Sequence, residues 1–114
     1  FVCDRASDMV ISGGVNIYPA ETENVLLQLP EVADCAVLGI PDEEYGEALL
    51  GLVLPVVGAS LNLDAVREHL ARHLADFKIP REIRIVTDLP RDDNGKVAKR
   101  KLRDQFWQKS QRQV

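Results

Sequence analysis

Apolar residues dominate two stretches of the chain, residues 32–40 and 49–57, and both are rich in valine and leucine. A polar segment, residues 41–46, separates them; it begins with proline and ends with glycine. Two β-prone runs joined by such a turn are typical of paired antiparallel strands. Residues 81–86 alternate charged and apolar side chains, which predicts a third strand with one solvated face.

The pattern also predicts three helices. Pro19 suits the first turn of a helix whose acidic start, Glu21 and Glu23, favours the positive N-terminal end, and Pro30 ends it. The apolar positions of this helix and of a second one recur at helical spacing: Val25, Leu26 and Leu29, then Leu63, Val66, Leu70 and Leu74. Either Asn62 or Asp64 is available to cap the second helix. The spacing of Leu102 and Phe106 predicts a third helix, basic in character, over residues 97–108.

A short apolar segment, residues 9–12, runs into Gly13 and Gly14, which permit the backbone angles of a tight turn. We therefore expect an α+β fold: a short β-hairpin segment, a central, mostly antiparallel three-stranded sheet and about three helices. The 114 residues are expected to form a single domain, residues 1–114.

Charge and cysteine content narrow the functional classes. The chain carries 14 Lys and Arg against 18 Asp and Glu, a net charge of −4, which argues against nucleic acid as a partner. No apolar stretch reaches membrane-spanning length. Cys3 and Cys35 lie in unlike contexts and are read as reduced thiols of a cytoplasmic protein. The basic run at residues 99–103 is read as a solvated face or a surface toward a partner domain and anionic ligands.

One polar loop, residues 89–96, is a candidate for chemistry. Its Asn94-Gly95 pair is a strong turn signal that presents Lys96, a mobile cation able to reach a phosphate or carboxylate. It is not a P-loop, because Pro90 stands where that motif needs glycine and no Ser or Thr follows the lysine. Taken alone, the pattern also fits an ordinary exposed hairpin lysine.

We expect no metal site in this chain. His69 and His73 are one helical turn apart beside Glu68, but no acid lies between them as in a zincin and no third ligand is apparent. A solvated helix face explains them. The acidic cluster at residues 42–47 lacks the spacing of a calcium-binding EF-hand.

Three separated segments, residues 4–21, 76–80 and 95–103, occur in an order found in one family. Together they resemble the C-terminal domain of the adenylate-forming superfamily, which includes acyl-CoA synthetases, peptide-synthetase adenylation domains and luciferases. The acyl-CoA synthetase (acid–thiol ligase) branch is the most similar, and the resemblance covers residues 4–106. It implies that the chain is the mobile C-terminal part of a larger two-domain ligase, inactive as a fragment.

The resemblance implies a reaction in two steps, in which a carboxylic acid and ATP give an acyl-adenylate and coenzyme A then displaces AMP. Lys96 matches the catalytic lysine of the first step, and Arg5 matches an arginine that contacts the nucleotide; an ordinary surface ion pair is the alternative for Arg5. The hinge of the domain falls near residues 5–8, at Ser7 and Asp8. The family usually has Asp or Lys at the position of Ser7.

The same resemblance implies five coenzyme A contacts. Gly13 and Gly14 match a turn that lines the pantetheine tunnel, although a plain β-turn also explains them. Tyr45 matches an aromatic residue that stacks on the adenine of coenzyme A. Phe77 is a second candidate, with core packing as its alternative, and Arg81 is placed to meet the coenzyme's phosphates.

The implied substrates are a carboxylic acid, ATP and coenzyme A, with Mg²⁺ bound alongside ATP mainly by an N-terminal domain outside this sequence. That N-terminal domain is the expected partner. Other functions stay open. Within the same superfamily these are an adenylation enzyme that loads a carrier protein and a luciferase-like oxidase, and outside it a stand-alone small module that binds a nucleotide or a protein.

Overall fold

A three-stranded sheet forms the centre of the protein, seen in a computed structural model that describes residues 9–44 and 46–112. Strand β3 (Val32–Asp42) pairs antiparallel with β4 (Gly46–Pro55), which confirms the predicted strand pair. The third strand, β5 (Glu82–Ile85), pairs with β4 in the parallel direction. The sheet is therefore mixed, because the long connection from β4 to β5 returns the chain to the same end of the sheet.

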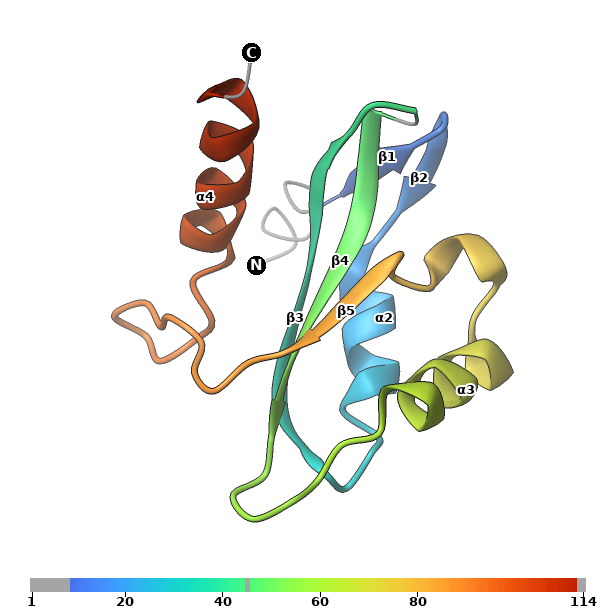
Figure 1. Cartoon of the computed structure of the whole chain (residues 1–114), viewed down its shortest axis with the longest axis vertical. Helices are drawn as coiled ribbons and strands as arrows, with labels where there is room; N and C mark the ends of the chain where they lie inside the picture. Colours follow the sequence, from blue (N-terminus) through green and yellow to red (C-terminus); the bar gives the residue numbers. More distant parts are fainter. Residues whose placement is uncertain (1–8, 45, 113–114) are drawn as a thin grey trace.

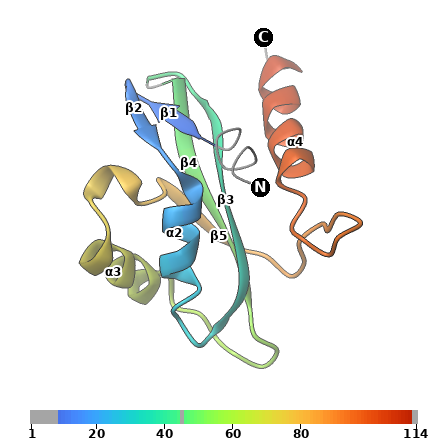
Figure 2. The ribbon, with the colours of Figure 1, turned by 180° about the vertical axis from the view of Figure 1, so that it is seen from behind.

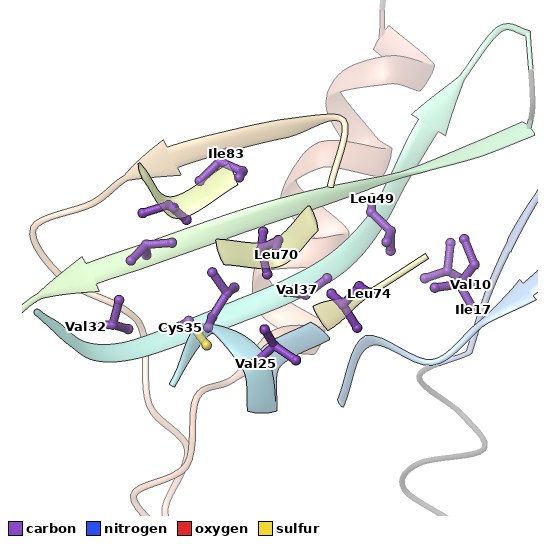
Figure 3. Close-up of a cluster of buried hydrophobic side chains, with 13 residues drawn as sticks. Val10, Ile17, Val25, Val32, Cys35, Val37, Leu49, Leu70, Leu74 and Ile83 are labelled. Carbon is purple, nitrogen blue, oxygen red and sulfur yellow. The ribbon is translucent and has the colours of Figure 1, made fainter. Parts of the chain in front are cut away.

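Two layers cover the two faces of this sheet (Figures 1 and 2). Helices α2 (Pro19–Leu26) and α3 (Leu63–His73) lie on one face, and α4 (Lys99–Arg112) lies on the other. Buried side chains divide accordingly into two clusters; the cluster under α2 and α3 is drawn in Figure 3. Strand β4 supplies Leu49 and Val53 to one cluster and Leu50 and Leu52 to the other. Residues 48–54 of β4 are all apolar because both faces of the strand are covered.

The helices begin where side chains or proline suit their first turns. Pro19 is at the start of α2, as predicted, but the helix ends at Leu26 and not at Pro30, because Gln28 and Leu29 donate to carbonyls three residues back in a tighter turn. Of the two possible caps of α3, the structure selects Asn62, whose side-chain oxygen accepts from the backbone N–H groups of Asp64 (2.9 Å) and Ala65 (3.3 Å). Helix α4 begins two residues later than predicted, because Val97 forms an isolated antiparallel bridge with Arg91.

A two-stranded hairpin, β1 (Val10–Ser12) and β2 (Val15–Ile17), packs beside the sheet on the α2 side. Its turn consists of Gly13 (φ 58°) and Gly14 (φ 84°). Positive φ at both central residues is the signature of a type I′ turn, and glycine adopts it without strain. The predicted turn is confirmed. A side chain at Gly14 would meet open space, so backbone conformation alone explains the glycine there.

In the described part of the chain, no helix combines the length and the apolar character needed to cross a membrane. The connection from α3 to β5 contains a short 3-10 helix, η1 (Asp76–Lys78), on the same side of the sheet as α2 and α3.

Candidate functional site

Lys96 lies at the exit of the loop between β5 and α4, and its backbone is held by one neighbouring carboxylate. An Asp92 Oδ1 atom accepts from the backbone N–H groups of Asn94 (2.8 Å) and Lys96 (3.1 Å). The Asp92 N–H in turn donates to the Lys96 carbonyl at 2.8 Å, and Gly95 takes a φ of 82°. The predicted turn is confirmed. It leaves the lysine side chain exposed on a backbone with a defined conformation.

Two ion pairs connect this loop and the start of α4 to β3 and α2. Arg91 Nη1 lies 2.6 Å from Asp34 Oδ2 on β3, and Lys99 Nζ, at the start of α4, lies 2.7 Å from Glu23 Oε2 on α2. Below the loop, Leu89 is buried in the cluster that also holds Leu102. The pattern of hydrophobic residues did not indicate either ion pair, because each joins residues far apart in the chain.

A hollow of about 400 Å³ opens on the opposite face of the sheet. Its walls come from the hairpin, the start of β4, η1 and the residues before β5. Three of the predicted coenzyme A contacts, Gly13, Phe77 and Arg81, line it together, while Gly14 is their exposed neighbour in the turn. Ser12 and Asp76 also line it, although the sequence pattern did not single them out. The volume lies within the range of small-molecule sites.

Phe77 belongs to the wall of this hollow and to neither buried cluster. Its side chain is 49% exposed, which argues against the core-packing alternative. Helix α2 holds η1 in place, since the buried Thr22 hydroxyl donates to the Lys78 carbonyl at 2.8 Å and Lys78 Nζ lies 2.7 Å from Glu21 Oε1. The ring of Phe77 therefore projects from a short helix, η1, which is held by a hydrogen bond to the Lys78 carbonyl and by the ion pair of the Lys78 side chain.

Arg81 reaches the rim of the hollow with its guanidinium already bound to a carboxylate. Its Nη1 lies 2.6 Å from Asp42 Oδ1, and its Nη2 lies 4.0 Å from Glu44 Oε2. Arg67 donates from its guanidinium to the carbonyls of Pro80 (3.2 Å) and Arg81 (3.1 Å), which holds the backbone there. An anion entering the hollow would meet a cation that is half exposed and partly neutralised.

The exposed lysine and the hollow lie on opposite sides of the sheet. In Figures 1 and 2, the loop before α4 lies on the α4 side, and η1 lies on the side of α2 and α3. This domain therefore offers two separate surfaces for chemistry.

Four of the predicted site residues, Arg5, Ser7, Asp8 and Tyr45, lie outside the described residues. The structure therefore tests neither the nucleotide contact, nor the hinge, nor the adenine stack.

The histidine pair is structural. His69 Nε2 lies 3.1 Å from the Val25 carbonyl, and the His69 and His73 rings lie 4.6 Å apart between centroids, so His69 contributes to the contact between α3 and α2. It is half-buried, where a fully solvated face was expected. Glu68 pairs with Arg72. Across residues 9–44 and 46–112, no group of three or more His, Cys, Asp or Glu side chains is placed to hold a metal ion.

Cys35 is a free, buried thiol beneath α2. Burial raises its pKa from 9.0 to about 12, and the carboxylates of Glu23 and Asp34 add to the increase. It remains a neutral thiol at physiological pH and is unsuited to nucleophilic chemistry.

Comparison with known proteins gives a consistent result. Residues 21–96 match the family described as AMP-binding enzyme C-terminal domain, and Lys96 is the last residue of that match. A 3-[(3aS,4S,7aS)-7a-methyl-1,5-dioxo-octahydro-1H-inden-4-yl]propanoyl:CoA ligase of Rhodococcus jostii is 47% identical over 91% of this chain and 20% of its own length. The fatty acid–[acyl-carrier-protein] ligase ScoC of Streptomyces coeruleorubidus is 40% identical over 100% of this chain and 22% of its own.

A solved structure agrees with these sequence matches. The fatty acyl CoA synthetase of Mycobacterium tuberculosis has a TM-score of 0.81 and 37% identity over 88% of this chain and 20% of that protein. The chain thus spans about a fifth of the length of the curated relatives it matches.

Proposed function

The chain belongs to the AMP-binding enzyme C-terminal domain family, and from this premise we propose that it is the C-terminal domain of an ATP-dependent acyl-CoA synthetase. In the first step, a carboxylate oxygen attacks the α-phosphorus of ATP and the bond to pyrophosphate breaks. In the second, the sulfur of coenzyme A attacks the acyl carbon and AMP leaves. The observation that carries the proposal is the placement of an exposed lysine and a separate hollow on opposite faces of one small domain.

Lys96 serves the first step. Two anions, the carboxylate and the α-phosphate, must approach each other, and a cation between them offsets their repulsion and stabilises the charge of the transition state. The backbone contacts of Asp92 support this role, because they hold the lysine's Cα while its flexible side chain stays free to reach the substrates.

The hollow serves the second step. A pantetheine chain is narrow and mostly apolar, and it fits beside the Gly13 turn, where no side chain projects. Phe77 offers an aromatic wall. Arg81 offers a cation that would bind the phosphate groups while its guanidinium is also paired with Asp42. The domain would rotate between the steps about a hinge at residues 5–8, near Arg5 and the nucleotide.

ATP, coenzyme A and the acid would be held mainly by an N-terminal domain. Mg²⁺ would be bound together with ATP, mainly by that domain. The likeness to ScoC favours a second candidate, a ligase whose acceptor thiol is carried by a protein. The two candidates share the first step and differ in the acceptor.

The experiment compares the two half-reactions of the full-length protein that carries this domain. Adenylation is measured by acid-dependent exchange of pyrophosphate into ATP, with octanoate, palmitate, benzoate and phenylacetate as the panel of acids. Thioester formation is measured from a supplied acyl-adenylate, with free coenzyme A or a carrier-borne thiol. Replacing Lys96 with Ala should slow adenylation by about a hundredfold or more and leave thioester formation nearly unchanged.

The matched control is Lys101→Ala, an exposed lysine of α4, which should leave both half-reactions intact. Equal loss of both half-reactions in Lys96→Ala would contradict the role of Lys96. The 114-residue chain alone should show no pyrophosphate exchange, and faster thioester formation on a carrier protein than on coenzyme A would favour the second candidate.

A further inference from the structure

Two carboxylates, one on α2 and one on β3, form ion pairs with residues on either side of Lys96. Glu23 belongs to α2 and Asp34 to β3, yet their partners, Lys99 and Arg91, flank the loop on either side of Lys96. The loop's own hydrogen bonds shape its turn but do not connect it to the sheet. Its placement relative to the domain depends on these two ion pairs, on the buried Leu89 and on Val97, which packs against the same cluster.

The Glu23–Lys99 pair is well suited to hold a fixed position. The two side chains are only 16% and 20% exposed, and the same Glu23 Oε2 atom also accepts from the Val37 backbone N–H at 2.8 Å. That N–H lies on the outer edge of β3, the edge strand of the sheet. The carboxylate thus fixes α2, the sheet and the start of α4 to one another. A charge-assisted contact shielded from water is stronger than an exposed ion pair.

The Asp34–Arg91 pair fixes the other end of the loop. The two carboxylate oxygens of Asp34 have different partners. Oδ1 accepts from the Cys35 backbone N–H at 2.8 Å, and Oδ2 lies 2.6 Å from Arg91 Nη1. The Arg91 guanidinium also donates to the Gly95 carbonyl at 3.4 Å, next to Lys96. The side chain of Arg91 therefore connects the edge of the sheet directly to the tip of the turn.

We propose that Glu23 and Asp34 are positioning residues for Lys96, acting through Lys99 and Arg91, without contacting any substrate themselves. This inference rests on the proposed function of Lys96. Adenylation requires the lysine cation at one place between two anions, and a displacement of about 1 Å in an active site can cost about a hundredfold in rate.

Two isosteric substitutions test this. Asp34→Asn keeps an oxygen that accepts from the Cys35 N–H. Its amide NH₂ group, a hydrogen-bond donor, then faces the Arg91 guanidinium, so the ion pair is lost. Glu23→Gln keeps an acceptor for the Val37 N–H and removes the charge that holds Lys99. In the full-length protein, the double variant should lose between about tenfold and a hundredfold in kcat for adenylation. KM values and thioester formation from a supplied acyl-adenylate should change little, because that step does not use Lys96.

Glu21→Gln is the matched control. It removes the same charge from the same helix but breaks the pair with Lys78, on the side of the hollow. It should leave adenylation unchanged. A decisive measurement adds Lys96→Ala: in that background the Glu23 and Asp34 substitutions should have no further effect, since they act only through the lysine.

Additive losses in the Lys96→Ala background, or equal losses in both half-reactions, would show that the carboxylates act through stability and would overturn the proposal. Unchanged adenylation in the double variant would overturn it as well. If Lys96→Ala itself leaves adenylation intact, the proposed role of Lys96 fails. If that variant loses adenylation while the Glu23 and Asp34 double variant does not, only the positioning role fails.

Discussion

Gly39→Ala should disrupt the contact between the hairpin and the sheet. Gly39 lies on β3, and a Cβ added there would come within 2.6 Å of Glu47 Oε2 and 2.9 Å of Val10 Cγ2. Its φ lies outside the left-handed region, so alanine strains no backbone angle. The effect is steric: β1 and the Glu47 carboxylate occupy the space that a methyl group needs.

The magnitude follows from what must move. Overpacking a tight site typically costs about 1–3 kcal/mol. The Glu47 carboxylate must also shift, and its Oε1 accepts from the Ile11 N–H at 3.1 Å, a bond whose loss costs about 1 kcal/mol. Together these effects predict a decrease of about 2–4 kcal/mol in the free energy of unfolding.

Urea denaturation of the 114-residue chain measures this change. The Glu47→Ala background removes the nearest atom that the new methyl group would approach and leaves Val10, so Gly39→Ala should cost about 1–2 kcal/mol less there. Gly51→Ala on β4 is the control: its Cβ would meet Pro80 Cγ at 3.2 Å and no atom closer, so its cost should be smaller. In the full-length protein, displacement of the hairpin should also raise the KM for coenzyme A.

Two results would refute this reasoning. Gly39→Ala could prove as stable as the unaltered chain, or it could cost as much with Glu47→Ala as without it. The first outcome would show that β1 does not depend on the absence of a side chain at Gly39, and the second would show that Glu47 contributes nothing to the steric effect.

Two further predictions concern stability. Because the native thiol of Cys35 keeps its proton until about pH 12 while an unfolded thiol loses it near 9.0, its contribution to stability is fully present below pH 9 and declines as pH rises toward 12. Urea titrations at pH 8 and 10.5 should show a steeper loss for the unaltered chain than for Cys35→Ala, and parallel losses would contradict this. Asn62→Ala should cost about 1 kcal/mol by removing the cap of α3; an unchanged midpoint in urea, against Asp64→Ala as control, would count against it.

Local patterns were sufficient for most of the secondary structure. Pro19, the stripe of α3 and the Gly13-Gly14 turn each act within a few residues, and all three were predicted correctly, although α2 ends at Leu26, before the predicted end at Pro30. The late start of α4 was missed because Val97 takes part in a bridge to Arg91 across the loop. The direction of β5 also depends on the path of the long connection, which local preference does not specify.

In the candidate site, too, some features follow from local sequence and others only from long-range contacts. The Asn94-Gly95 turn and its lysine could be read from adjacent residues, because the turn's hydrogen bonds are local. The hollow could not, since its walls come from three separate segments of the chain, residues 12–17, 48–49 and 76–81. The partners of Glu23, Asp34 and Glu47 were equally hidden, because charged residues are common and only folding selects which of them meet.

The sequence by itself therefore determined the helices, the strand pair, the two turns and the presence of Lys96 in an exposed loop. Only the tertiary structure decided that this loop and the hollow lie on opposite faces of one sheet, and that two distant carboxylates anchor the loop. These interactions differ in how far apart along the chain their partners lie. Turns, caps and apolar periodicity act between near neighbours, whereas ion pairs and cavities form between segments that burial of the core brings together.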